Sequence, residues 1–234
     1  MSNLTEKVFS MKLKQLCKPL AQAFAMAALS AGAVAAPVTF TESVAGTGFL
    51  PGTAEVVAGG AHNGLTILGN LVDGRGGNPP NVVDMYGFSV SQAGRYFFDT
   101  FGSDIFDPQL FLFDTIGNGL YWNNDASITP SITQSSFSTV LGAGNYFIAF
   151  SFYGVDPADG LFLPLFDTLN SNEGTALAGS GAVAQWVDAF GQTIWDRTAY
   201  SINIRVPEPG ALALSLAALG LLAGVSRRRQ ATLA

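Results

Sequence analysis

Cysteine and histidine are almost missing from this sequence: each occurs once in 234 residues, as Cys17 and His62. Zinc sites use several Cys and His ligands, so a zinc site is not expected. Ser-His-Asp catalysis needs a histidine beside its nucleophile, and His62 is the one histidine available for it. His62 lies in a Gly-Ala-His-Asn-Gly segment that is typical of a surface loop. Because Cys17 lies in a segment that we expect to be removed, the mature protein has neither a disulfide nor a nucleophilic cysteine.

Positive charge is also scarce, and it is placed unevenly. All four lysines precede residue 20. Between Ala36 and Val206, four arginines stand against fifteen carboxylates, which gives a net charge of about −11 at neutral pH. Such a surface repels nucleic acid and anionic lipid and favours solubility. Nucleic acid is therefore excluded as a partner, whereas divalent cations are compatible with the surface.

The N-terminal segment has the order of a secretory signal peptide. Its lysines lead into the apolar run Leu20–Val34, which overlaps the small residues Ala33-Val34-Ala35. We predict a signal peptide over residues 1–35, cut between Ala35 and Ala36, because a cut one residue later would place Pro37 first. Export machinery and signal peptidase are the implied partners. The alternative is an uncleaved N-terminal anchor.

The C-terminal segment, residues 206–229, has three parts in a fixed order. Pro207, Glu208 and Pro209 are followed by the apolar run Gly210–Val225 and then by Arg227, Arg228 and Arg229. A helix over residues 210–226, at ~1.5 Å per residue, approaches the ~30 Å of a bilayer core when its arginines snorkel. Arginines stay on the cytoplasmic side, so the rest of the chain is expected on the opposite side.

This tail resembles the PEP-CTERM sorting signal of Gram-negative bacteria. In that family the tail is a transient anchor, which the membrane enzyme exosortase recognises and cleaves. The resemblance implies exosortase as a partner, a transient stay in the inner membrane, and then a place at the cell surface or in the extracellular matrix. The alternative is a plain single-pass anchor.

Residues 36–205 are predicted to form one all-β domain, a β-sandwich of jelly-roll-like type, flanked by the signal helix and the transmembrane helix. The middle of the chain has short runs rich in Phe, Tyr, Val and Ile, separated by turn residues, and Gly117-Asn118-Gly119 indicates a hairpin. Residues 36–69 are expected to add a strand pair, and residues 69–81 and 170–181 to be loops. The expected strands are Val82–Val90, Arg95–Phe101, Gln109–Asp114, Leu120–Asn123, Ser136–Leu141, Asn145–Tyr153, Leu161–Phe166 and Tyr200–Val206.

Part of this region resembles the bacterial pre-peptidase C-terminal domain, a β-sandwich appended to secreted peptidases and to many surface proteins. The motifs are Asp84-x-Tyr86-x-Phe88-x-Val90, Ala93-Gly94-x-Tyr96, Asp107-Pro108-x-Leu110-x-Leu112-Phe113-Asp114, Asn124-Asp125 and Leu141-x-Ala143-Gly144-x-Tyr146. They cover residues 82–153. The chain departs from the family in having Asn124 where a second Asp is usual, and in the insert Asp156–Gln185. The resemblance implies a fold more firmly than a function.

Acidic and amide side chains gather at the expected strand ends around the hairpin Gln109–Asn123. Ca²⁺ in proteins takes six to eight oxygen ligands, and a secreted protein meets it readily. We therefore name Asp107, Asp114, Asn124 and Asp125 as candidate Ca²⁺ ligands. The spacing is not that of an EF-hand, and the alternative is that these residues form Asx turns and solvated strand ends.

Three functional hypotheses follow from the sequence, and none of them names a catalytic residue. The first is a non-catalytic surface or matrix protein that associates with extracellular polysaccharide or acts in adhesion. The second is a Ca²⁺-dependent carbohydrate-binding module, in which Trp122 is a candidate to stack on a sugar. The third is a secreted hydrolase that uses a pair of carboxylates.

Overall fold

The computed structural model describes residues 37–43, 48–58, 64–71, 82–105, 107–127, 131–188 and 198–206. All of them belong to one compact unit, Ala36–Pro207. The described ranges contain thirteen strands and no helix, and so none long and apolar enough to cross a membrane. The expected signal helix and the expected transmembrane helix over residues 210–226 lie outside these ranges.

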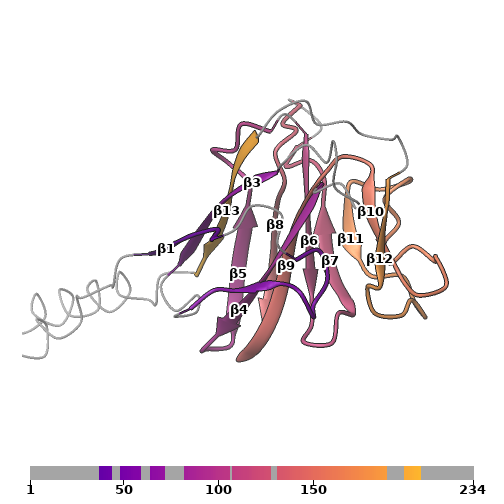
Figure 1. Ribbon diagram of the computed structural model, residues 1–234, viewed down its shortest axis with the longest axis horizontal. Coiled ribbons are helices and arrows are strands. Elements are labelled where there is room, and N and C mark those ends of the chain that lie inside the picture. Colours follow the sequence, from indigo (N-terminus) through magenta and orange to yellow (C-terminus); the bar gives the residue numbers. More distant parts are fainter. Residues whose placement is uncertain are drawn as a thin grey trace, which may run out of the picture. The chain divides into compact units, whose positions relative to one another are not determined.

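Two sheets account for most of the strands (Figure 1). The six-stranded sheet consists, in order, of β11 (Glu173–Thr175), β7 (Gly119–Asn123), β6 (Pro108–Phe113), β9 (Gly144–Phe152), β4 (Val83–Val90) and β2 (Glu55–Val56). The five-stranded sheet consists of β1 (Val38–Thr41), β3 (Leu65–Leu71), β13 (Thr198–Arg205), β5 (Gly94–Asp99) and β8 (Ser136–Leu141). A separate pair joins β10 (Val155–Ala158) to β12 (Gln185–Asp188). Neighbouring strands are antiparallel except for β1 with β3 and β2 with β4.

Aromatic rings connect the two large sheets across their inner faces. Phe150 of β9 stacks on Tyr200 of β13 with ring centroids 4.1 Å apart. Phe88 of β4 meets Phe98 of β5 edge-on at 6.1 Å. Offset and edge-on rings at these separations contribute about 0.5–1.5 kcal/mol per pair beyond the area that they bury. The all-β prediction is confirmed, and the sheets pack in a sandwich-like way; the jelly-roll-like connection stays a prediction.

The predicted strand at Leu161–Phe166 is wrong. The only pairing within it is an isolated bridge between Ala158 and Pro164, and Phe162 has a φ of 63°. The cause is Asp159, whose carboxylate accepts hydrogen bonds from the backbone N–H groups of Leu161 and Leu163. A side chain that captures nearby backbone donors in this way competes with strand pairing.

The chain on either side of this turn also differs from the sequence-based expectation. Part of the loop expected over residues 170–181 is a strand, since β11 pairs with β7 through Glu173 and Asn123. The strand pair expected within residues 36–69 is present as β1 and β3, which run parallel. The insert after β9 therefore adds strands to the body and is not merely a loop.

The hairpin predicted at Gly117-Asn118-Gly119 is confirmed, and it positions the candidate site. Gly117 has a φ of 90°, a left-handed conformation that glycine adopts without a steric penalty. The hairpin joins β6 to β7 in antiparallel register, with Leu110 opposite Asn123. The residue before β6 and the residues after β7 consequently lie at the same end of the sheet.

Candidate functional site

Three of the four predicted Ca²⁺ ligands meet at that end of the sheet. Asp107 immediately precedes β6, and Asn124 and Asp125 immediately follow β7. Asn124 donates from Nδ2 to Oδ2 of Asp125 at 3.1 Å. The same carboxylate oxygen accepts a hydrogen bond of 2.9 Å from Nδ2 of Asn172. The structure thus forms a compact group of oxygen-bearing side chains, which we call the β6–β7 acidic site: Asp107, Asn124, Asp125 and Asn172.

Asp114, the fourth predicted ligand, is not part of this group. It follows the last residue of β6, so it lies roughly 20 Å along the strand from Asp107. Its carboxylate closes the hairpin, where it accepts hydrogen bonds from the backbone N–H groups of Ile116 and Asn118 at 3.0 and 2.9 Å. Asp114 therefore forms an Asx turn, which was the alternative to its predicted role as a Ca²⁺ ligand.

Two oxygens of the β6–β7 acidic site are buried without a hydrogen-bond partner. They are Oδ1 of Asp107 and Oδ1 of Asn124, and the Asn124 residue is only 6% exposed. A buried polar group left unsatisfied costs about 1–3 kcal/mol. Burial raises the pKa of Asp107 to about 6, and the negative charge of Asp125 adds to the effect. Burial likewise raises the pKa of Asp125, and its hydrogen bond with Asn124 opposes this.

Such unsatisfied oxygens are the kind of ligand atom that a hard cation such as Ca²⁺ binds. Carboxylate and amide oxygens from Asp107, Asn124 and Asp125 fit Ca²⁺, and backbone carbonyls and water would complete a shell of six to eight. Among the described residues, however, no three Asp, Glu, His or Cys side chains are grouped closely enough to hold a metal ion by themselves. The site therefore supplies two carboxylates and one amide oxygen.

A buried serine fixes the strand ends beneath the site. Oγ of Ser135 lies 2.6 Å from the carbonyl oxygen of Pro108 and 2.9 Å from those of Asn123 and Asn124. Oδ1 of Asn123 accepts a hydrogen bond from the N–H of Ser136 at 2.7 Å. These contacts connect the start of β6, the end of β7 and the start of β8, so the ligand-bearing segments are held in place.

A second buried polar group lies between the sheets. The hydroxyl of Tyr200 donates to Oδ2 of Asp84 at 2.7 Å and lies 2.6 Å from the hydroxyl of Tyr86. Burial and the charge of Asp84 raise the pKa of both tyrosines well above 10, so their hydroxyls stay protonated. Asp84 and Tyr86 lie two residues apart on β4 and so share a face of that strand, but their partner Tyr200 gave no local signal in the sequence.

Trp122 is part of the core and does not face a ligand. It is buried and stacks on Phe111 with ring centroids 6.0 Å apart and an interplanar angle of 13°. The sequence offered Trp122 as a candidate to stack on a sugar, but the buried indole has no exposed face on which a sugar ring can stack. His62 and Trp195 lie outside the described residues.

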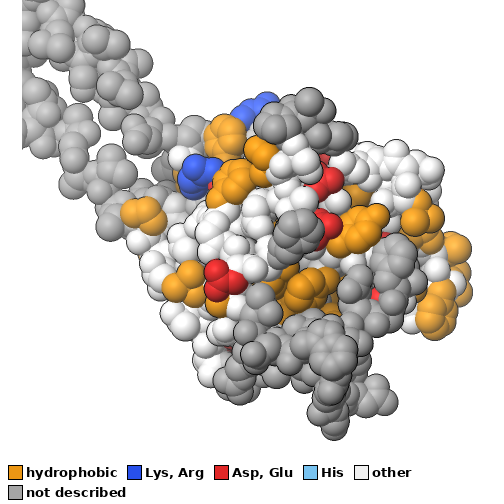
Figure 2. All heavy atoms as spheres, turned by 90° about the horizontal axis from the view of Figure 1, so that it is seen from above, with side chains coloured by type: hydrophobic (Ala, Val, Ile, Leu, Met, Phe, Trp, Pro, Cys, Tyr) orange, Lys and Arg blue, Asp and Glu red, His pale blue; other side chains and the backbone are white. Residues whose placement is uncertain are grey.

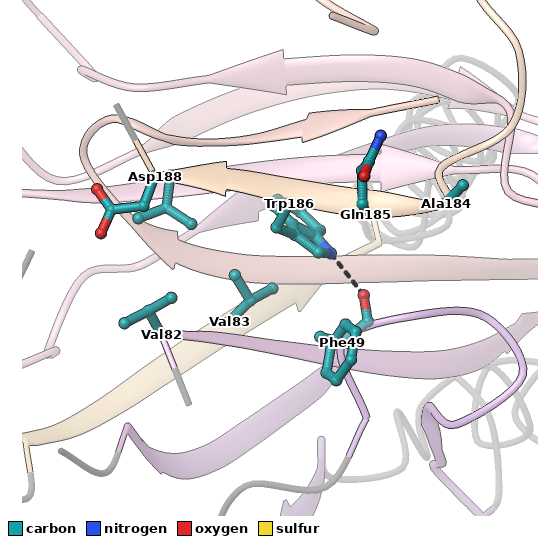
Figure 3. Close-up of a pocket in the computed structure, with 8 residues that line it drawn as sticks. Phe49, Val82, Val83, Ala184, Gln185, Trp186 and Asp188 are labelled. Atoms are coloured by element: carbon teal, nitrogen blue, oxygen red, sulfur yellow. Dashed lines mark hydrogen bonds between the residues drawn. The ribbon is translucent and has the colours of Figure 1, made fainter. Parts of the chain in front are cut away.

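Of the two described tryptophans, the one that borders open space is Trp186 of β12 (Figure 3). It lines a hollow of about 440 Å³ together with Phe49, Val82, Val83, Val155, Ala184, Gln185 and Asp188. Nε1 of the indole donates to the carbonyl oxygen of Phe49 at 2.6 Å, which fixes the ring. Ligand pockets typically span ~300–1,000 Å³ and combine apolar walls with a few polar groups, as this hollow does.

The residues predicted for sorting and cleavage lie outside the described ranges. These are Ala35 and Ala36 at the signal junction, and Pro207, Glu208, Pro209, Arg227, Arg228 and Arg229 in the tail. The last described strand, β13, ends at Arg205 and is followed by Val206. The tail thus begins directly after a strand of the five-stranded sheet.

Comparisons with known proteins place the tail in a defined class. Residues 205–230 match the family model of the PEP-CTERM protein-sorting motif. Proteins with this motif are exported and anchored transiently in the membrane. The tail of this chain carries that motif, which implies an exported protein that exosortase processes. The predicted resemblance of residues 206–229 to this sorting signal is confirmed, and the transmembrane helix over residues 210–226 stays a prediction.

The comparisons say less about the body. No curated protein matches the sequence. Among solved structures, the chain is similar to the pre-peptidase C-terminal domain of a collagenase from Bacillus anthracis, at 12% identity and a TM-score of 0.34. The match covers 65% of this chain and 94% of that domain. This is the family that the motifs of residues 82–153 resemble, and likeness at this level carries no conclusion about function.

Proposed function

We propose that the protein is a non-catalytic component of the cell surface or extracellular matrix that binds extracellular polysaccharide. The observation that carries the proposal is the sorting motif at residues 205–230, which directs the chain out of the cytoplasm. The strongly acidic composition of residues 36–206 agrees with an extracellular place, because it favours solubility and opposes adsorption to anionic lipid.

The hollow beside Trp186 is the part of the body best suited to hold a sugar. A fixed indole offers an apolar face, and the Asp188 carboxylate, two residues further along β12, supplies a polar group on the same side of the strand. Carbohydrate sites pair an aromatic surface with groups that bond hydroxyls. This assigns to Trp186 the stacking role that the sequence had offered to Trp122.

Binding of the exported protein to polysaccharide from its own producing cells tests this function. We expect Trp186→Phe and Asp188→Asn each to weaken binding several-fold. The first shrinks the aromatic surface on which a sugar ring stacks, and the second removes the negative charge of a carboxylate that accepts hydrogen bonds from sugar hydroxyls. Trp122→Phe is the matched control: it makes the same change in the core and should leave affinity unaltered. Absence of binding by the unaltered protein, or equal affinity of all variants, contradicts the proposal.

A second candidate function, Ca²⁺-dependent binding, is favoured by the two unpartnered oxygens of the β6–β7 acidic site. A cation that binds only the folded chain stabilises it by about 2.7 kcal/mol at a hundredfold excess over Kd. For a domain of this size that corresponds to a rise in Tm of about 5 °C or more. Ca²⁺ would lie against Asp107, Asn124 and Asp125 and supply a positive charge there.

Thermal unfolding with Ca²⁺ and with EDTA measures this effect. We expect Ca²⁺ to raise the Tm of the unaltered protein and to leave that of Asp107→Asn unchanged. Asp114→Asn lies at the other end of β6, so it should lower the Tm through the hairpin yet keep the Ca²⁺ response. A Tm that does not respond to Ca²⁺ rules out the site, and an equal response in Asp107→Asn places the ion elsewhere.

A further inference from the structure

The turn Asp159–Leu163 is built to hold three consecutive apolar side chains in solvent. The Asp159 carboxylate accepts from the N–H groups of Leu161 and Leu163 at 2.8 and 3.0 Å, and the Asp159 N–H donates to the Leu163 carbonyl at 2.9 Å. Phe162 is held at a φ of 63°, a conformation that bulky residues adopt rarely. Leu161 is 78% exposed and Phe162 71%. A turn this constrained presents its apolar side chains in a fixed arrangement.

These side chains belong to a larger apolar surface. Phe162 and Leu169 line a hollow of about 260 Å³ together with Leu177 and Val187, and Leu169 is 86% exposed. Figure 2 shows hydrophobic side chains gathered at the right-hand end of the molecule, the end where Figure 1 places β10 and β12. Contiguous apolar surface of this kind marks an interaction site. We call it the insert patch: Leu161, Phe162, Leu163, Leu169, Leu177 and Val187.

Among the described residues, the charged side chains that line or hold the insert patch are acidic. Asp156 and Asp167 line its hollow, and Asp159 holds its turn. The sequence has no lysine or arginine between Arg95 and Arg197. Anionic lipid is therefore repelled from this surface, whereas an apolar surface flanked by cations is attracted to it.

The same chain carries such a surface on the outer face of its five-stranded sheet. Arg95 lies opposite Val140, and Phe97 lies opposite Arg205, so all four side chains share one face. Val140 is 65% exposed, and the Arg205 side chain is 62% exposed although it forms an ion pair with Asp99. Arg95 and Arg205 are the cations of the described part of the chain. We call these four residues the sheet patch; Figure 2 shows the cationic side chains beside hydrophobic ones, away from the right-hand end.

From these two surfaces we propose that the protein self-associates head to tail, with the insert patch of one copy bound to the sheet patch of the next. The two patches lie on different strands, one beside β10 and β12 and the other on β5, β8 and β13. When two copies bind through different patches, the pair still has one free insert patch and one free sheet patch. Further copies can therefore add to form an open chain, unless the rotation from each copy to the next closes a ring. Self-association goes beyond polysaccharide binding and does not depend on it.

Thiol cross-linking of the full chain in its producing cell tests the contact. In a Cys17→Ser background no native thiol remains. Leu161→Cys places a thiol in the insert patch and Val140→Cys places one in the sheet patch, and a bis-maleimide reagent then links thiols that lie close together. The double variant should give a ladder of dimers, trimers and higher species. Co-expressed single variants should give dimers and no larger species, and either single variant alone should remain monomeric. Dimers from Leu161→Cys alone would show a symmetric contact instead and overturn the proposal, as would the lack of any ladder.

A substitution in the insert patch tests whether this patch itself forms the contact between copies, or only lies near it. In the double-cysteine chain, Leu169→Asp should reduce the ladder at least several-fold, because it replaces an apolar side chain of the contact with a carboxylate that loses its hydration when it is buried. Ile116→Asp is the matched control, since Ile116 is also a largely exposed aliphatic residue, 69% exposed, but lies on the β6–β7 turn. A ladder that survives Leu169→Asp, or that is lost equally in Ile116→Asp, contradicts the assigned surface.

Discussion

At the scale of single residues, the buried carboxylate of Asp84 and the half-buried carboxylate of Asp107 show how a structural group differs from a functional candidate. Asp84 accepts a hydrogen bond from Tyr200 between the two sheets, and that hydroxyl also meets Tyr86. Asp107 instead keeps a buried oxygen that accepts no hydrogen bond within the described chain. The first carboxylate belongs to the core, whereas the second has capacity left for a proton or a cation.

The pKa of Asp107 gives a prediction about stability and pH. Its pKa is about 6 in the folded chain, above the ordinary value of 3.8. The folded state therefore holds this proton more tightly than the unfolded state, so the free energy of unfolding falls as pH rises from about 4 to about 6. In EDTA, urea unfolding should show this fall, and Asp107→Asn should make it shallower.

Asp167→Asn is a suitable control for that measurement, because Asp167 is an exposed carboxylate outside the β6–β7 acidic site. It should leave the pH profile unchanged. The Ca²⁺ proposal implies that the ion and the proton compete for Asp107, so it predicts that the rise in Tm with Ca²⁺ shrinks below about pH 6. A profile in Asp107→Asn that is as steep as in the unaltered chain would show that other groups cause the dependence.

At the scale of elements, the β6–β7 hairpin depends on the conformation of one glycine. Gly117 has a φ of 90°, and a Cβ placed there would lie 3.0 Å from Cγ of Pro51. Gly117→Ala should lower the free energy of unfolding by about 1 kcal/mol or more. Gly160→Ala, where a Cβ has open space and φ is not positive, should be neutral or slightly stabilising. Urea unfolding compares the free energies of unfolding of the two variants, and equal effects would show that a side chain at position 117 causes no strain.

The elements also show where sequence patterns suffice. Runs rich in aromatic and β-branched residues located β4 and β8, although both strands pair with distant segments, and turn glycines located the β6–β7 hairpin, which is a local pairing. The apolar run Leu161–Phe166 read as a strand, yet Asp159 captures its backbone donors. Asn172 joins the acidic site through the pairing of β11 with β7, a contact between distant segments that no local pattern indicates.

At the scale of the whole molecule, the sequence separates signals from body. The described body carries Arg95 and Arg205 as its cations, while the sorting motif begins at Arg205, the last residue of β13. An acidic body held by an aromatic core needs no disulfide, which agrees with a single cysteine in the predicted signal segment. The polysaccharide, Ca²⁺ and self-association proposals all concern this body once it is outside the cytoplasm.

The assignment of both termini as export and sorting signals is tested most directly by mass spectrometry of the protein recovered from outside its producing cell. The expected species begins at Ala36 and lacks the apolar run Gly210–Val225 together with Arg227, Arg228 and Arg229. Recovery of the intact chain, residues 1–234, from the cell interior alone would contradict the assignment.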